Sequence, residues 1–195
     1  MASLAQPDPV AQEGVEGRIE RYAPFASACV EDRNVDVWLP PGYDDDPERR
    51  YPVLYVHDGQ NLFVPELSFS GTDWGVDETL ARLGAGGEVH VPIVVGVWNT
   101  PRRIAEYMPQ RPMEEGHQPR LIDRFVENYG HAPCSDAYLR FLVAELKPFV
   151  DAAYRTRPDR AGTFVMGSSM GGLISLYALC EYPDVFGGAA CLSTS

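Results

Sequence analysis

Alternating apolar and polar positions near the start of the chain predict two strands at a sheet edge. In residues 34–40 the apolar side chains Val35, Val37 and Leu39 occupy every second position. Residues 17–30 form a second extended segment just before it. Because the connection between them is short, we expect the two to pair as antiparallel strands.

Longer apolar runs predict strands that are covered on both faces, as in a parallel sheet. These runs are YPVLYVH at 51–57, VHVPIVVGVW at 89–98, AGTFVMG at 161–167 and GGAACLST at 187–194. The last of them has the composition of a central strand.

Helical spacing of apolar residues alternates with these runs, at 72–83, 135–149 and 168–182. We expect Thr72 or Asp73 to cap the first helix and Ser135 to cap the second. Pro148 is expected to kink the second helix, and Pro183 to end the third.

This alternation of strands and helices predicts an α/β fold with a mostly parallel central sheet and helices on both faces. We expect one domain at 16–195 after a flexible tail at 1–15. Residues 99–133 are polar, proline-rich and weakly periodic, which predicts an active-site loop or lid, with a surface insertion as the alternative.

Charge and composition exclude several classes of partner. The chain has 16 Lys and Arg against 28 Asp and Glu, a net charge of −12, which disfavours nucleic acid and anionic membrane surfaces. No apolar stretch is long enough to span a bilayer, and the first residues lack the pattern of a signal peptide. The four cysteines have no metal-binding spacing, so we expect free thiols and a cytoplasmic protein, although an exported one with its signal removed would look the same.

The run Gly167-Ser168-Ser169-Met170-Gly171 fits the G-x-S-x-G motif between a predicted strand and a predicted helix. In such a turn the two glycines let strand and helix approach, and the middle serine is exposed above the sheet. We interpret Ser169 as a nucleophile and the Met170 amide as an oxyanion donor at the helix N-terminus. The alternative is a Gly-Ser turn that only connects the two elements.

Two further groups of polar residues follow earlier strands. After 51–57 comes His57-Asp58-Gly59-Gln60, where the Gln60 amide is a candidate second oxyanion donor. For His57 and Asp58 we favour turn formation and hydrogen bonding over proton transfer.

The next strand is followed by four side chains that could shape a substrate pocket, because ligands bind at the carboxyl ends of strands in such sheets. They are Trp98, Asn99, Arg103 and Tyr107. An ion pair between Arg103 and Glu106 within one helical turn is the competing interpretation.

These segments together resemble the esterase branch of the α/β-hydrolase superfamily, which includes enterochelin esterase-like, feruloyl esterase-like and acetyl xylan esterase-like enzymes and the mycolyltransferases. The resemblance rests on YPVLYVHDGQNLF, DWGVDE, VVGVWNTPRRIAEYMP and MGSSMGGLISLYAL. It implies an α/β-hydrolase fold, Ser169 as the nucleophile, and Met170 and Gln60 as the oxyanion donors.

The chain departs from that family in one respect. There the triad acid and the histidine follow the nucleophile, whereas all four histidines here precede Ser169, and the acids after it are Glu181 and Asp184. We therefore expect a fold that is incomplete at its C-terminal side and a chain with little activity alone. The alternatives are a base from an upstream histidine or a partner, or a non-catalytic binding protein.

The resemblance implies a serine hydrolase that acts on small-molecule or carbohydrate-linked carboxylic esters through an acyl-enzyme. It implies no metal and no organic cofactor. An acyltransferase is the closest alternative. The sequence leaves the acyl group, the alcohol and the oligomeric state open.

Overall fold

Strands form one mixed sheet in the computed structural model, which describes residues 7–9, 14–115 and 119–194. In chain order they are β1 (Asp8–Pro9), β2 (Arg18–Phe25), β3 (Arg33–Leu39), β4 (Val53–His57), β5 (Ile93–Val97), β6 (Thr163–Ser168) and β7 (Gly188–Leu192). Their order across the sheet is β1-β2-β3-β5-β4-β6-β7. Neighbours from β1 to β5 pair antiparallel, and those from β5 through β4 and β6 to β7 pair parallel.

The strand predictions are confirmed, including the antiparallel pair β2–β3, in which Glu20 faces Val37. Within the expected flexible tail, Asp8–Pro9 pairs with β2, while residues 1–6 and 10–13 lie outside the described residues. The run at 187–194, which has the composition of a central strand, forms β7. β7 is the last strand in the order of the described sheet, and Leu192 at its end is 44% exposed.

Helices cover both faces of the sheet, as the sequence predicts. They are α1 (Val76–Ala85), α2 (Arg103–Tyr107), α3 (Gln110–Glu115), α4 (Pro119–Tyr129), α5 (Ser135–Arg140), α6 (Lys147–Ala153) and α7 (Met170–Glu181). A π-helical stretch, Phe141–Leu146, joins α5 to α6. Short 3-10 turns lie at Tyr43–Asp45, Gly59–Asn61, Pro65–Leu67 and Arg160–Gly162.

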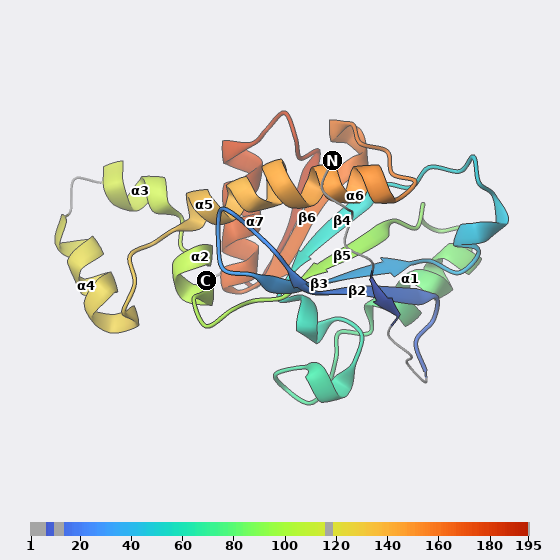
Figure 1. Ribbon diagram of the computed structural model, residues 1–195, viewed down its shortest axis with the longest axis horizontal. Helices are drawn as coiled ribbons and strands as arrows, with labels where there is room; N and C mark the ends of the chain where they lie inside the picture. The colour runs from blue at the N-terminus through green and yellow to red at the C-terminus, as the bar shows by residue number, and fades with distance from the viewer. Residues whose placement is uncertain (1–6, 10–13, 116–118, 195) are drawn as a thin grey trace.

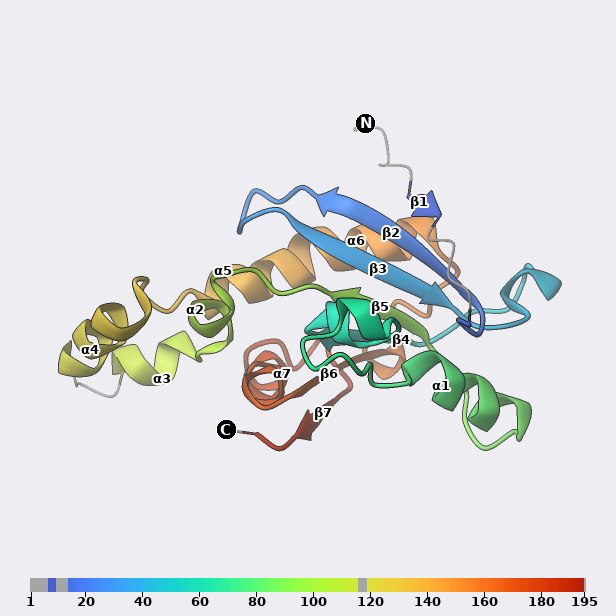
Figure 2. The same ribbon diagram turned by 90° about the horizontal axis from the view of Figure 1, so that it is seen from below.

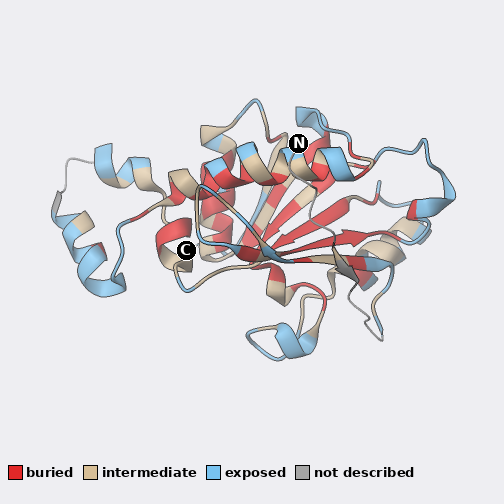
Figure 3. Cartoon of the chain, viewed as in Figure 1, coloured by how far each residue is buried: buried red, intermediate tan, exposed pale blue. Residues whose placement is uncertain are grey.

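Side chains alternate between two apolar cores along each central strand, because successive residues of a strand point to opposite faces. On β5, Ile93, Val95 and Val97 pack in the core that includes α5, α6 and α7, whereas Val94 packs in the core that includes α1. Figures 1 and 2 show α1 on one side of the sheet and the α5–α6 rod and α7 on the other. Figure 3 shows β4, β5 and much of β6 as buried.

Two predicted caps are wrong. Helix α1 begins at Val76 after Gly75, which has a φ of 56° and takes the cap position without a side-chain bond. Cys134 is the N-cap of α5, and Ser135 is its first residue, whose Oγ accepts a hydrogen bond from the Gln110 N–H at 2.9 Å. In both cases a tertiary contact or a backbone conformation replaces the side-chain cap that local sequence favours.

The kink expected at Pro148 stays a prediction, but the hydrogen-bonding pattern changes close to it: a π-helical stretch ends at Leu146, and Pro148 lies at the start of α6. Proline lacks an N–H and its ring clashes with the carbonyl four residues earlier, so the regular hydrogen bonding is disturbed there. Pro183 follows the end of α7, as predicted. That helix is only partly buried, however, since Leu176 is 47% exposed.

The segment expected to be a loop or lid, 99–133, is mostly helical. It contains α2, α3 and α4, of which α3 and α4 extend away from the sheet (Figures 1 and 2). Pro112 lies near the start of α3 and Pro119 begins α4, and proline is tolerated in the first helical turn. A proline in this segment is therefore compatible with a helix.

The four cysteines are free, as expected. Among the described residues, no helix is both long enough and apolar enough to cross a membrane.

Candidate functional site

Ser169 occupies a sharp turn between β6, which ends at Ser168, and α7, which begins at Met170. Its φ of 56° and ψ of −124° are uncommon for a residue with a side chain. A Cβ atom on Gly167 would lie 2.5 Å from the carbonyl carbon and oxygen of Gly171. Strand and helix thus touch backbone to backbone, an approach that the glycine at 167 permits.

The first turn of α7 begins directly after this serine. The Ser169 carbonyl accepts hydrogen bonds from the N–H groups of Gly172 (2.9 Å) and Leu173 (3.1 Å). The amides of Met170 and Gly171 come earlier in the helix, where no carbonyl one turn back is available to them. Helix N-termini attract negative charge, so this turn is suited to a negative oxygen beside Ser169.

A second turn follows β4 and carries Gln60. Asp58 has a left-handed conformation with a φ of 61°, and the 3-10 turn Gly59–Asn61 comes directly after it. A Cβ atom on Gly59 would lie 2.4 Å from the carbonyl carbon of Gly96, so the turn rests on the backbone of β5. This glycine allows the chain to pass close to the sheet at the carboxyl end of β4.

The two turns contact each other. A Cβ atom on Gly171 would lie 3.3 Å from Oδ2 of Asp58 and 3.4 Å from Cβ of His57. The structure therefore brings the Gly167–Gly171 segment next to the His57–Gln60 segment, although more than a hundred residues separate them in the sequence.

Arg103 forms a two-point ion pair with Asp58. Its Nε and one terminal nitrogen donate to Oδ1 and Oδ2 at 2.7 and 2.8 Å, and the Asn99 side-chain amide also donates to Oδ1 at 2.7 Å. The Asp58 carboxylate raises the pKa of Arg103. Both charges are thus satisfied at the carboxyl ends of β4 and β5.

The alternative pairing of Arg103 with Glu106 is wrong. Glu106 accepts two hydrogen bonds from Arg33 instead, at 2.6 and 2.9 Å, and both side chains are 1% exposed. The two residues lie three apart on α2, but tertiary partners of opposite charge are closer to each. Nothing in the local sequence indicates these long-range pairs.

His57 is entirely buried, and its Nδ1 shares a 2.7 Å hydrogen bond with the Tyr138 hydroxyl. Its Nε2 has no hydrogen-bond partner among the described residues. Burial lowers the pKa of His57 to about 4. It therefore stays neutral at pH 7, in accord with the structural role that we favoured for it.

The other upstream histidines also differ from a triad histidine in position. His90 is exposed and precedes the amino end of β5, whereas Ser169 follows the carboxyl end of the parallel strand β6. His131 is exposed in the segment after α4. His117 lies outside the described residues.

Polar residues line a cavity of about 460 Å³ at this end of the sheet. Its lining residues are Asp58, Gln60, Asn61, Phe69, Asn99, Thr100 and Arg103. Of the four expected pocket residues, Asn99 and Arg103 therefore line a cavity beside the candidate oxyanion turn.

Trp98 and Tyr107 are not among these lining residues. The Trp98 indole N–H donates to Asp36 at 2.9 Å, and the Arg21 guanidinium stacks on its ring. Tyr107 is fully buried, and its hydroxyl accepts the Asp58 N–H at 3.3 Å. Their aromatic rings are used for packing behind the site, which periodicity alone does not reveal.

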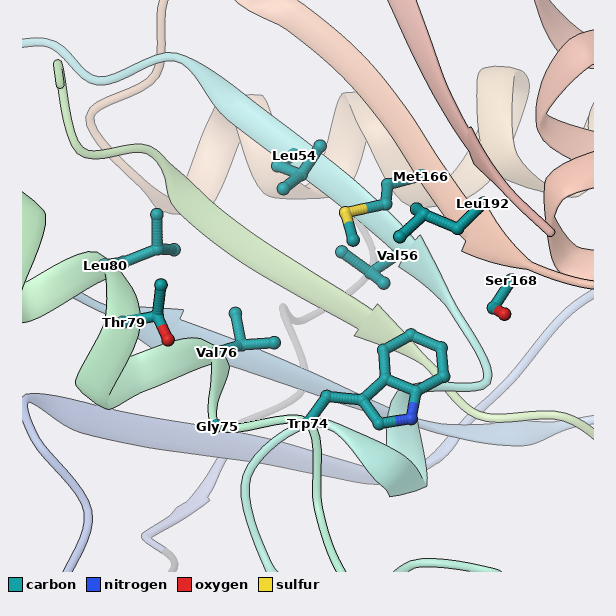
Figure 4. Close-up of a pocket in the computed structure, with 10 residues that line it drawn as sticks. All are labelled: Leu54, Val56, Trp74, Gly75, Val76, Thr79, Leu80, Met166, Ser168 and Leu192. Atoms are coloured by element: carbon teal, nitrogen blue, oxygen red, sulfur yellow. The ribbon is translucent and has the colours of Figure 1, made fainter.

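A second, apolar cavity of about 500 Å³ lies on the α1 side of the sheet (Figure 4). Its lining includes Val56 from β4, Met166 and Ser168 from β6, Trp74 before α1, and Leu192 from β7. Figure 4 shows both Ser168 and the indole of Trp74 among the side chains that line it. Trp74 was not among the expected pocket residues, although it lies within the DWGVDE segment.

Within residues 7–9, 14–115 and 119–194, no group of three or more His, Cys, Asp or Glu side chains could hold a metal ion.

A protein family and two curated proteins match most of this chain in sequence. Residues 26–195 match the family described as "Putative esterase". Two curated Bacillus subtilis (strain 168) proteins, the uncharacterized YbbA and YjcH, are 26% and 28% identical over 84% and 88% of this chain. The chain spans 57% and 59% of their lengths, respectively.

Solved structures share the fold. An IroE-like serine hydrolase from Shewanella oneidensis has a TM-score of 0.66 and 26% identity, over 92% of this chain and 51% of that one. A ferulic acid esterase from Anaeromyces mucronatus has a TM-score of 0.61 and 22% identity, over 95% of this chain and 62% of that one. The enterobactin esterase from Shigella flexneri has a TM-score of 0.61 and 20% identity, over 98% of this chain and 40% of that one. The mixed sheet with helices on both faces is thus the α/β-hydrolase fold.

Proposed function

Because the chain belongs to this esterase family, we propose that it provides the nucleophile and the oxyanion hole of a carboxylic ester hydrolase, with Ser169 as the nucleophile. The observation that carries the proposal is the backbone of Ser169, which combines a φ of 56° with a position at the N-terminus of α7. A serine that only connected a strand to a helix would have no need of this uncommon conformation.

In the proposed reaction the Ser169 Oγ attacks the ester carbonyl carbon while a base removes the hydroxyl proton. The carbonyl π electrons move to the oxygen, and the amides of Met170 and Gln60 stabilise that negative charge. The intermediate then expels the alcohol, which receives the proton, and leaves an acyl-enzyme on Ser169. A water molecule then attacks the carbonyl carbon of the acyl-enzyme in the same way, which releases the acid and restores the Ser169 hydroxyl.

We further propose that the histidine and the acid of the triad come from outside the residues described. His57 supports this view, because it is buried, bonded to Tyr138 and, with a pKa of about 4, a weak base. His90 is at the opposite end of the parallel strands. This chain by itself would therefore react slowly.

For the substrate we propose a small-molecule or carbohydrate-linked ester. The 460 Å³ cavity beside Gln60 is lined by amide groups and by Phe69, which is 97% exposed and could contact an aromatic or sugar ring. The structurally similar proteins include a ferulic acid esterase and an enterobactin esterase, which supports the same substrate class.

Reaction with a fluorophosphonate, followed by intact mass, tests the nucleophile. We expect slow single labelling of the chain, accelerated by added imidazole acting as an external base, and none in Ser169→Ala. Ser168→Ala is the matched control and should be labelled like the parent chain. Labelling that persists in Ser169→Ala, or no labelling at any imidazole concentration, would contradict the proposal. Fast labelling without imidazole would show that a base already reaches Ser169.

A further inference from the structure

Asp58 is held in an unfavourable backbone conformation by contacts from a single neighbouring segment. Its φ of 61° is left-handed, a region that few residues with a Cβ atom adopt, although Asp and Asn do so more often than others. Its carboxylate receives two hydrogen bonds from Arg103 and one from Asn99, at 2.7 to 2.8 Å. Its own N–H donates to the Tyr107 hydroxyl at 3.3 Å. Residues 99–107 thus supply all four contacts.

The residues that follow Asp58 are restricted by the same segment. Gly59 touches the backbone of β5 at Gly96, and the Asn99 N–H donates to the Gln60 side-chain oxygen at 3.3 Å. Because Asp58 also lies against Gly171, a shift of its carboxylate would be felt at the first turn of α7. The turn that carries Gln60 is therefore set between β5, residues 99–107 and α7.

Arg103 is held in place by contacts other than its ion pair with Asp58. Its guanidinium lies 5.1 Å from the centre of the Tyr107 ring, and Tyr107 is fully buried. Three residues along α2 from Arg103, Glu106 forms the buried ion pair with Arg33 of β3. The helix that presents Arg103 is thus fixed to the sheet independently of Asp58.

We infer that Arg103 is a positioning residue, which acts through the Asp58 carboxylate to hold the Gln60 N–H where the oxyanion forms. The inference rests on the proposed function of Ser169. A planar guanidinium that binds both carboxylate oxygens restricts rotation of the carboxylate, whereas a single charge would not. Misplacing an oxyanion donor by about 1 Å costs on the order of a hundredfold in rate.

The alternative role for Arg103 is direct contact with the substrate, because it also lines the polar cavity. The two roles predict different kinetics. A substrate contact contributes mainly to binding, whereas a positioning residue contributes mainly to the chemical step.

The test measures fluorophosphonate inactivation in imidazole and separates the maximal rate constant from the inhibitor constant. For Arg103→Ala we expect the maximal rate constant to fall about tenfold to a hundredfold, with the inhibitor constant unchanged within about twofold. Arg103→Lys should regain part of the rate, since one of the two contacts can be remade. Arg102→Ala removes a guanidinium of similar exposure that pairs with Glu31 instead, and should react like the parent chain.

Hydrogen exchange of the same variants tests the inference without chemistry at Ser169. We expect faster exchange at the Gly59–Asn61 amides in Arg103→Ala than in Arg102→Ala. Unchanged exchange there, or a raised inhibitor constant with an unchanged maximal rate, would overturn the positioning role. Failure of the parent chain to react with the probe would instead contradict the function proposed for Ser169, and exchange would then decide on the Asp58 contact alone.

Discussion

Gly171 and Asp58 meet between the two functional turns: a Cβ atom at position 171 would lie 3.3 Å from the Asp58 carboxylate oxygen Oδ2. This distance is short, but a shift of a few tenths of an ångström in the Asp58 side chain would relieve it. The corresponding contact at Gly167, 2.5 Å from the backbone of Gly171, leaves no such room. The two glycines of one motif therefore have different physical constraints.

From this difference we predict unequal effects of alanine at the two sites. Gly167→Ala should destabilise the fold by about 2–3 kcal/mol, because strand and helix must separate. Gly171→Ala should cost about 1 kcal/mol or less. Urea unfolding followed by circular dichroism measures both. Equal losses for the two variants would mean that the backbone contact at Gly167 relaxes easily.

The buried ion pair between Arg33 and Glu106 provides a second prediction. Glu106→Leu leaves the 1% exposed guanidinium without its partner and should reduce the free energy of unfolding by about 3–5 kcal/mol. The double variant Arg33→Met/Glu106→Leu should recover most of that loss, because it removes both charges from the interior.

The exposed pair between Arg18 and Asp44 is the matched control. These side chains are 50% and 65% exposed, so Asp44→Ala should cost less than about 1 kcal/mol in the same unfolding experiment. A double variant at 33 and 106 as unstable as the single one would show that other contacts of Arg33, such as its stacking on Tyr138, carry the stability.

The buried position of His57 leads us to predict that the free energy of unfolding decreases at acidic pH. Its pKa is about 4 in the folded chain against 6.5 for an unperturbed histidine, so protonation favours the unfolded state. The stabilisation is complete above pH 6.5 and is lost as the pH falls toward 4. The shift corresponds to about 3 kcal/mol.

Urea unfolding of the parent chain and of His57→Asn, at several pH values from 7 to 4, measures this effect. Carboxylates contribute to the acid sensitivity of both proteins, so the informative quantity is the difference in free energy of unfolding between them. We expect this difference to shift by about 3 kcal/mol against the parent chain between pH 7 and pH 4. A difference that stays constant with pH would show that His57 has the same pKa in the folded and the unfolded chain, so that burial does not lower it.

The sequence by itself determined which segments of the central region form strands and helices along the chain, and it determined the turn at Ser169. Short apolar runs such as 51–57 predict buried strands, because a run of this length without helical spacing is typical of a strand covered on both faces. Gly167 and Gly171 predict a close approach of strand and helix, because only glycine lacks the atoms that would prevent it. These features are local, so a local pattern can predict them.

Tertiary structure alone decided which side chains meet. Arg103 pairs with Asp58 rather than with its helical neighbour Glu106, and Glu106 pairs with Arg33 from β3. Proximity across the sheet selects these partners, and the free energy of burying a charge requires that each be matched. The conformation of Asp58 and the low pKa of His57 have the same origin, since both depend on what the packed interior places beside them. Such contacts join residues far apart in the chain, so the pattern of apolar and polar positions does not predict them.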